Sequence, residues 1–213
     1  MKTQSFTTLR LLEKGILAAV IMACAIMPAT ISAQIGGCTG GHGANLVTNG
    51  GFQTGSGYNI ADWTVAWDST ADPYVYISTN GQGGSSKALW LGSIPGENRV
   101  SQVIPNLTAG KPYILCFYLS NGATAAFTPN SFEATWNDKN VLQIVNSDTF
   151  GYVYFSFQVE AVGGGNDVLS FEERNATDFW YLDNVYVQAC AACTNYFSPA
   201  DGVATKPLPS GSE

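Results

Sequence analysis

The stretch that decides the fold is NLVTNGGFQTGSGYNIADWTVAW, residues 45–67. Its short apolar start breaks on Asn49-Gly50-Gly51, where asparagine and glycine accept the backbone angles of a tight turn. Phe52 follows as an apolar anchor, and after a second glycine-rich loop the chain continues as a strand from Trp63. This order of strand, tight loop, buried aromatic residue and second strand predicts the entrance to a β-sandwich.

The first 33 residues have the features of a secretory signal peptide. Basic residues come first, an apolar run covers residues 15–27, and Ile31-Ser32-Ala33 is an acceptable cleavage site. The run is too short to span a bilayer comfortably. We therefore expect cleavage after Ala33, no membrane insertion and a secreted protein, with the cell surface or the periplasm as alternatives. Lipoprotein-type processing at Cys24 is less favoured, because it would leave an apolar terminus exposed.

The composition of the remaining 180 or so residues limits the partners. Removing residues 1–33 leaves 6 basic residues against 15 acidic residues, a net charge of −9. Nucleic acid and anionic membranes need clustered Lys and Arg, so both are poor partners. Neutral sugars and divalent cations are compatible with this charge. Sparse charges, many aromatic residues and glycines, and dense β-branched residues are typical of an all-β protein.

Short strand patterns recur at the spacing of a sandwich or barrel, with no helical period and no internal repeat. We expect a glycine-rich leader at residues 34–44, one domain at 45–188 and a Cys-containing, Pro/Ser-rich tail at 189–213. The expected strands after the opening stretch are Thr64–Asp68, Tyr74–Ser78, Ala88–Gly92, Arg99–Ile104, Tyr113–Ser120, Ser131–Asn137, Val141–Val145, Tyr152–Glu160, Val168–Glu172 and Trp180–Val187.

Four cysteines follow the signal peptide, which permits three disulfide pairings in an oxidising compartment. Cys38 precedes the first strand, and Cys190 and Cys193 follow the last, so a bridge from Cys38 to Cys190 or Cys193 is the economical prediction. Cys116 lies inside a strand pattern and is expected to be a small buried hydrophobic residue. A zinc site at the two C-terminal cysteines is less favoured, because His42 is the sole histidine in the sequence.

Alternation along the strands predicts which side chains face the sandwich interior. Four apolar rows are expected there, made by Leu89 and Leu91; Tyr113, Leu115, Phe117 and Leu119; Phe132, Ala134 and Trp136; and Val153, Phe155, Phe157 and Val159. The opposite rows carry aromatic residues, which is unusual for a solvent-facing surface. We expect them to bind a ligand by stacking on sugar rings, unless loops cover some of them: Tyr74, Tyr76, Trp90, Tyr118, Tyr152 and Tyr154.

The sequence does not favour catalysis. His42 lies in the leader, so a Ser/His or Cys/His pair lacks its base. Glycoside hydrolysis needs two carboxylates that face one bond. Glu172 and Glu173 are adjacent in a strand and therefore point to opposite faces.

A cation site is a further hypothesis, because calcium takes six to eight oxygen ligands from carboxylates, amides and carbonyls. Gln53, after the first tight turn, and Asp183, on the last strand, are the candidate ligands. The alternative is a purely structural turn hydrogen-bonded to Asp183.

The ordered combination of residues 45–53, Trp63, Val100-Ser101-Gln102, residues 110–117 and Tyr181-Leu182-Asp183-Asn184-Val185 resembles the galactose-binding-like jelly rolls. It is most similar to carbohydrate-binding modules attached to xylanases and to related secreted, cell-wall-associated proteins without assigned function. In those relatives a Glu after the Gly-Phe pair and an Asp in the closing strand hold a structural calcium ion. Asp183 matches this Asp, whereas Gln53 replaces the charged ligand with a neutral one.

The resemblance implies an all-β jelly-roll β-sandwich over residues 45–187, and no sugar-binding residue carries over from it. We predict a secreted, non-catalytic protein that binds an extracellular or cell-wall polysaccharide, neutral or uronic. The alternative function is a structural or adhesive surface protein that binds another protein. An enzyme is the third and least favoured interpretation.

Overall fold

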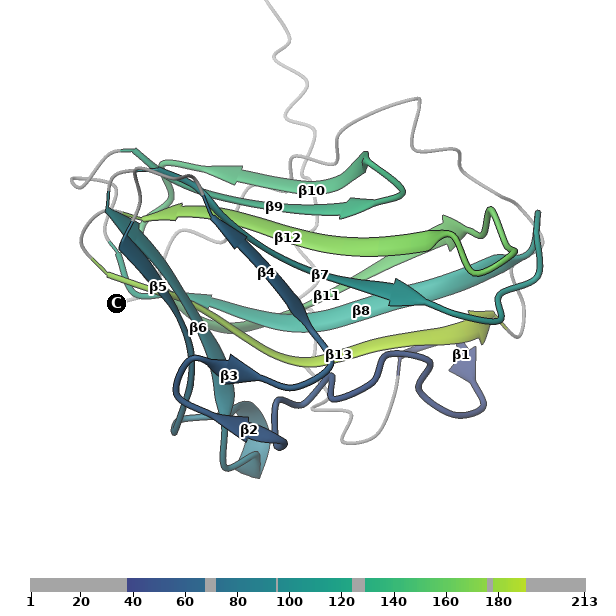
Figure 1. The fold of residues 1–213 in the computed structure, drawn as a ribbon, viewed down its shortest axis with the longest axis horizontal. Coiled ribbons are helices and arrows are strands. Elements are labelled where there is room, and N and C mark those ends of the chain that lie inside the picture. Colours follow the sequence, from purple (N-terminus) through teal and green to yellow (C-terminus); the bar gives the residue numbers. More distant parts are fainter. Residues whose placement is uncertain (1–37, 68–71, 95, 124–128, 176–177, 191–213) are drawn as a thin grey trace, which may run out of the picture. The chain divides into compact units, whose positions relative to one another are not determined.

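The computed structural model describes residues 38–67, 72–94, 96–123, 129–175 and 178–190. The domain consists of two facing antiparallel sheets (Figure 1). One sheet has the order β11-β8-β13-β6-β5, with β1 paired to β13, and the other has the order β10-β9-β12-β7-β4. This is the predicted all-β sandwich. No helix in the described part of the chain is long and apolar enough to cross a membrane.

The ten strands expected after the opening stretch are all present. Their observed bounds are β4 Thr64–Trp67, β5 Asp72–Ser78, β6 Ala88–Ile94, β7 Asn98–Ile104, β8 Pro112–Asn121, β9 Asn130–Trp136, β10 Lys139–Val145, β11 Phe150–Glu160, β12 Asp167–Asn175 and β13 Trp180–Cys190. The short strands are β1 Gly41–His42, β2 Gly55–Ser56 and β3 Asn59–Ile60, and one 3-10 turn, η1, covers Gln82–Gly84.

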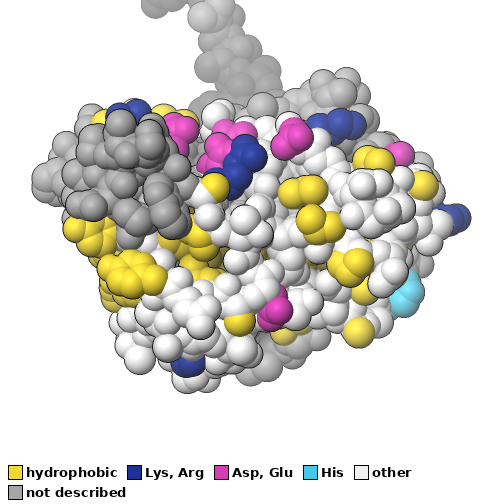
Figure 2. Space-filling view, in the orientation of Figure 1, with side chains coloured by type: hydrophobic (Ala, Val, Ile, Leu, Met, Phe, Trp, Pro, Cys, Tyr) yellow, Lys and Arg dark blue, Asp and Glu magenta, His cyan; other side chains and the backbone are white. Residues whose placement is uncertain are grey.

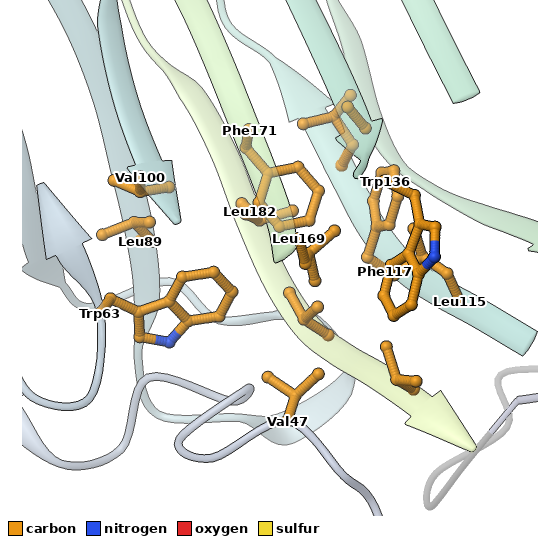
Figure 3. Close-up of a cluster of buried hydrophobic side chains, with 14 of the residues drawn as sticks. Val47, Trp63, Leu89, Val100, Leu115, Phe117, Trp136, Leu169, Phe171 and Leu182 are labelled. Atoms are coloured by element: carbon orange, nitrogen blue, oxygen red, sulfur yellow. The ribbon is translucent and has the colours of Figure 1, made fainter. Parts of the chain in front are cut away.

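The interior rows are confirmed. One cluster of buried hydrophobic side chains from both sheets lies between the sheets, and its members include every interior residue predicted from alternation, with Val153 and Phe157 at its margin. Figure 3 shows the part of the cluster in which Phe117, Phe171 and Leu182 lie between strands of the two sheets. Trp63 closes one side of it, with its ring centroid 5.5 Å from that of Phe52.

The opening turn docks on the last strand. Phe52 is fully buried, and its backbone N–H donates to the carbonyl of Asn49 at 3.0 Å. Val185 donates its N–H to the carbonyl of Gly50 at 2.9 Å, and a Cβ at position 50 would lie 2.0 Å from the Val185 carbonyl oxygen. Gly50 is therefore required for close approach of two backbones, while Asn49, with φ of 52°, supplies the left-handed turn residue.

Candidate functional site

The outer face of the six-stranded sheet carries the predicted aromatic residues. Val75 and Ile77 of β5 are buried in the core, so Tyr74 and Tyr76 point to the opposite side. The strand register places Tyr76 beside Trp90 on β6, and Trp90 beside Tyr181 on β13. Together with Phe179, which precedes β13, these side chains form what we call the aromatic surface: Tyr74, Tyr76, Trp90, Phe179 and Tyr181.

Trp90 is the centre of the aromatic surface. Its ring centroid lies 4.8 Å from that of Tyr181, 5.4 Å from that of Phe179 and 5.5 Å from that of Tyr76. The Trp90–Tyr181 pair is perpendicular, which is a favoured geometry for aromatic rings. The indole N–H donates to the carbonyl of Thr79 at 3.2 Å. Trp90 is partly buried, so it packs against its neighbours and keeps part of its surface accessible to solvent.

The exposed rings lie at the margins. Tyr74 is 38% exposed and packs edge-on against Phe179, with centroids 6.5 Å apart. Tyr58, between the short strands β2 and β3, is 68% exposed and lies 5.9 Å from Tyr76. Figure 2 shows hydrophobic side chains gathered over the β5 side of the molecule, next to residues outside the described set.

A glycine makes room for one ring of the aromatic surface. A Cβ on Gly92 would lie 2.8 Å from Cδ1 of Phe179, so the ring rests directly on the backbone of β6. Gly92 is opposite Tyr74 in the strand register. The missing side chain at position 92 therefore lets Phe179 pack between Tyr74 and Trp90.

Two phenol hydroxyl groups of this sheet, from Tyr152 on β11 and Tyr181 on β13, are hydrogen-bonded within the protein. The Tyr152 hydroxyl donates to the carbonyl of Asn80 at 3.0 Å, and burial, with a smaller effect from Asp183, raises the pKa of Tyr152 far above its ordinary value. The Tyr181 hydroxyl donates to Oδ1 of Asp178 at 3.1 Å, and burial followed by the Asp178 charge raises the pKa of Tyr181 to about 12. Both phenols stay protonated at neutral pH, and because each O–H already donates within the protein, their oxygens remain as acceptors for a polar ligand.

The other half of the same face is covered. Tyr118 points outward as alternation predicts, yet it is only 3% exposed and packs against Tyr154 in a tilted pair with ring centroids 5.3 Å apart. The cover over Cys116 and Tyr154 is the segment 38–43: its strand β1 pairs with the end of β13, and Cys38 packs on Ile114 and Cys116. Thr39 donates its N–H to the Tyr154 hydroxyl at 3.0 Å. The expectation that the ring of Tyr118 faces solvent, on which its predicted role in ligand binding depended, is wrong, because Tyr118 is buried.

A disulfide holds this cover, and it is not the predicted one. Cys38 is bonded to Cys116 of β8, 78 residues away in the sequence. The predicted bridge from Cys38 to Cys190 or Cys193 is therefore wrong, and so is the interpretation of Cys116 as a simple hydrophobic residue. Cys190 is also disulfide-bonded, and Cys193 lies outside the described residues. The physical reason is that Cys116 points to the outer face, where Cys38 reaches it.

The predicted calcium ligands, Gln53 and Asp183, lie near one loop, residues 82–87. Oδ2 of Asp183 accepts the N–H of Gln82 at 2.8 Å, and its Oδ1 accepts the N–H of Asn184 at 2.7 Å. Nε2 of Gln53 donates to Oγ of Ser85 at 2.8 Å, and Ser85 is also close enough to hydrogen-bond Asp183. Ser85 therefore links the two predicted ligands.

This arrangement does not fit a calcium ion well. Calcium needs six or more oxygens aimed at one point, whereas the carboxylate oxygens of Asp183 accept backbone N–H groups and Oε1 of Gln53 accepts the Ser86 hydroxyl at 2.8 Å. Among the described residues, no three His, Cys, Asp or Glu side chains are grouped to hold a metal. The Gln53 side chain directs an N–H donor, not an oxygen, toward Ser85.

Alternation could have found one residue that the sequence analysis missed. Trp180 and Leu182 are fully buried in the core, so Tyr181 between them must point outward. Phe179 and Tyr58 lie outside the long strands, and no periodic pattern marks them. Glu172 and Glu173 do point to opposite faces as predicted: Glu173 is buried, and Glu172 pairs with Arg99 at the surface.

Comparison with known proteins identifies the fold class. No protein-family model matches the sequence, and no curated protein matches it. The structure of TmCBM61 in complex with β-1,4-galactotriose has a TM-score of 0.51 and 19% identity, over 69% of this chain and 99% of that one. The enzymatically active domain of tailspike protein 4 of bacteriophage CBA120 has a TM-score of 0.51 and 20% identity, over 68% of this chain and 21% of that one.

A third structure, the CBM22-1 xylan-binding domain of Paenibacillus barcinonensis Xyn10C, has 14% identity and a TM-score of 0.47, over 73% of this chain and 99% of that one. At these identities the similarity establishes the fold alone. The domain has a jelly-roll fold like that of TmCBM61, which agrees with the fold that the sequence motifs predicted.

Proposed function

We propose that this protein is a secreted, non-catalytic carbohydrate-binding protein that holds an extracellular or cell-wall polysaccharide on its aromatic surface. The observation that carries the proposal is the group of rings around Trp90 on the outer face of a jelly-roll sheet. Flat rings present apolar area with little rotamer entropy to lose, which suits the C–H faces of a pyranose. The carbohydrate-binding modules among the similar folds support this at the level of the fold.

Charge favours a neutral glycan over a uronic one. The mature chain has a net charge of −9, and Asp178 lies at the margin of the aromatic surface, hydrogen-bonded to Tyr181. An anionic sugar placed on these rings would meet a like charge at short range. Hydroxyl groups of a neutral sugar can instead donate hydrogen bonds to the phenol oxygens and to the carboxylate of Asp178.

A glycan array probed with the secreted chain tests the proposal, followed by affinity measurements on the glycan that binds best. Tyr74→Ala should weaken binding by on the order of 1 to 3 kcal/mol, as for other ring-stacking contacts. It is the cleaner variant because Tyr74 is 38% exposed and its loss should leave folding nearly unchanged. Trp90→Ala should weaken binding at least as much, but it also removes contacts to three rings, so its melting curve must be measured alongside.

Val145→Ala is the control, because Val145 is 56% exposed on β10 of the opposite sheet. Saturable binding that is lost in the aromatic variants and kept in the control supports the proposal. The proposal is overturned if the protein binds no glycan on the array, or if Tyr74→Ala and Trp90→Ala leave binding unchanged. The first of these results would favour the protein-binding alternative for the same exposed rings.

A further inference from the structure

Lys87, just before β6, reaches across to the opening loop. Its ammonium donates to the carbonyl oxygen of Gln53 at 3.0 Å and to the carbonyl oxygen of Gly55 at 3.0 Å. Two carbonyls converging on one positive charge is the arrangement by which backbone oxygens bind a cation. Here the cation is a side chain of the protein itself.

The neighbouring polar side chains are hydrogen-bonded to one another and to the backbone. The side-chain amide of Gln53 is hydrogen-bonded to Ser85 and Ser86, so its oxygen is not directed at a metal ion. The Ser85 hydroxyl donates to the carbonyl of Lys87 at 2.8 Å, which fixes the backbone from which the lysine extends. Asp183 is buried behind this loop, with both oxygens accepting backbone N–H groups.

The charges of the cluster also balance without a metal. Two carboxylates, from a Glu at position 53 and from Asp183, would neutralise one divalent ion. With Gln53 in place of the Glu, Asp183 supplies one negative charge and the ammonium of Lys87 one positive charge. Burying a carboxylate is costly unless opposite charge or hydrogen bonds compensate it, and the N–H groups of Gln82 and Asn184 supply such hydrogen bonds to Asp183.

We propose that the ammonium of Lys87 takes the place of a bound calcium ion in this jelly roll, so that the loop at residues 53–55 is held by a built-in cation and the fold is independent of calcium. The inference does not rest on the carbohydrate-binding function. It revises the sequence-based hypothesis of a calcium ion at Gln53 and Asp183, and it explains why a neutral Gln is compatible with this position.

The held loop has a structural consequence. Gly55 begins the short strand β2, which pairs with β3 through Gly55–Ile60 and Ser56–Asn59. Gly57 is bridged to Ile77 of β5, and Tyr58 at the tip lies against Tyr76. Lys87 therefore anchors the base of the hairpin that carries Tyr58 to the edge of the aromatic surface.

The first test uses the unmodified secreted chain. Its melting temperature should be the same after extensive chelation and after addition of millimolar calcium, because a ligand stabilises a protein only if it binds the folded state preferentially. A melting temperature that falls on chelation and recovers with calcium overturns the proposal. This test needs no variant, so it stands even if substitutions impair folding.

The second test removes the positive charge of Lys87 and, in a double variant, adds a carboxylate at position 53. Lys87→Met should lower the melting temperature by several degrees, with or without calcium, whereas Lys139→Met at an exposed position of β10 should not. The double variant Lys87→Met with Gln53→Glu should regain stability as calcium is added, and Lys87→Arg should retain much of the original stability. The proposal is overturned if Lys87→Met has the same melting temperature as the unmodified protein. It is also overturned if calcium does not raise the melting temperature of the double variant.

Discussion

The two halves of one sheet face differ in what lies above them. On β5, β6 and the start of β13, Trp90 and its ring neighbours form a partly exposed surface. On β8, β11 and the end of β13, Tyr118 is buried beside Tyr154, and the segment 38–43 covers Cys116, to which Cys38 is disulfide-bonded. Both halves have the same alternation of core and outward aromatic residues. The difference teaches that alternation tells which side of the sheet a ring faces, but not whether that ring meets solvent.

The largest expected difference between the halves is in stability. Tyr118→Ala should lower the free energy of unfolding by about 3 to 5 kcal/mol, because it removes a buried ring and leaves a cavity beside Tyr154. Tyr74→Ala, on the open half, should cost less than about 1 kcal/mol. Denaturant unfolding of the two variants measures both values. Equal losses would mean that the two halves are buried alike.

Removing the covalent tie should uncover the closed half. The double variant Cys38→Ser with Cys116→Ser should lose about 2 to 4 kcal/mol of stability, because the unfolded chain regains the freedom of a long loop. Quenching of tyrosine fluorescence by a neutral quencher should increase, while glycan binding to the open half stays the same. The variant is preferable to a reducing agent, because Cys190 is also disulfide-bonded. Loss of glycan binding in the folded variant would show that the halves are coupled.

Raising the pH should lower the free energy of unfolding of the whole domain, because the group responsible lies in the interior shared by both halves. Glu173 is 1% exposed between the sheets, and burial, only partly offset by a hydrogen bond from Asn98, raises its pKa to about 8, with Glu97 adding to the rise. The folded state thus holds this proton more tightly than the unfolded state. Stability should be greatest in acid and fall as pH rises above about 4.5, by about 2 to 3 kcal/mol between about pH 5 and pH 7.

Unfolding free energies measured across this pH range check the prediction, and Glu173→Gln should flatten the curve. Oε2 of Glu173 and Oδ1 of Asn98 have no hydrogen-bond partner among the described residues, which agrees with a neutral, poorly solvated carboxyl group. Glycan affinity, corrected for the folded fraction, should not follow the same curve. A stability that rises toward neutral pH would contradict this assignment.

The sequence was sufficient for the strands and the core rows, because each depends on a local period-two pattern such as Phe155 and Phe157 on β11. It was also sufficient to place Trp90, Tyr74 and Tyr76 on the outer face. The cover was not predictable, since residues 38–43 are rich in glycine and have no periodicity. Cys116 seemed buried by its strand pattern, but the partner that buries it comes from 78 residues earlier.

The contact between Lys87 and the loop at residues 53–55 shows the same limit of prediction from sequence. The motif around Gln53 and Asp183 indicated that these residues share a region, and the structure does join them through Ser85. Nothing local in the sequence indicates that Lys87 reaches the carbonyls of residues 53 and 55, because that contact joins segments 32 to 34 residues apart. Contacts of this kind depend on the path of loops, which alternation does not determine.

The smallest expected effects on stability come from two Tyr→Phe variants, one in each half of the face. These variants distinguish the halves most clearly, because each removes a single oxygen atom. Tyr154→Phe deletes the acceptor for the Thr39 N–H under the cover, and Tyr181→Phe deletes the donor to Asp178 on the open half. Each should lower stability by about 0.5 to 1.5 kcal/mol, the usual net value of one hydrogen bond. Only Tyr181→Phe should also change glycan affinity, since its hydroxyl borders the proposed ligand surface. If Tyr154→Phe weakens glycan binding as much as Tyr181→Phe, the ligand reaches the covered half, and the segment 38–43 must move aside to admit it.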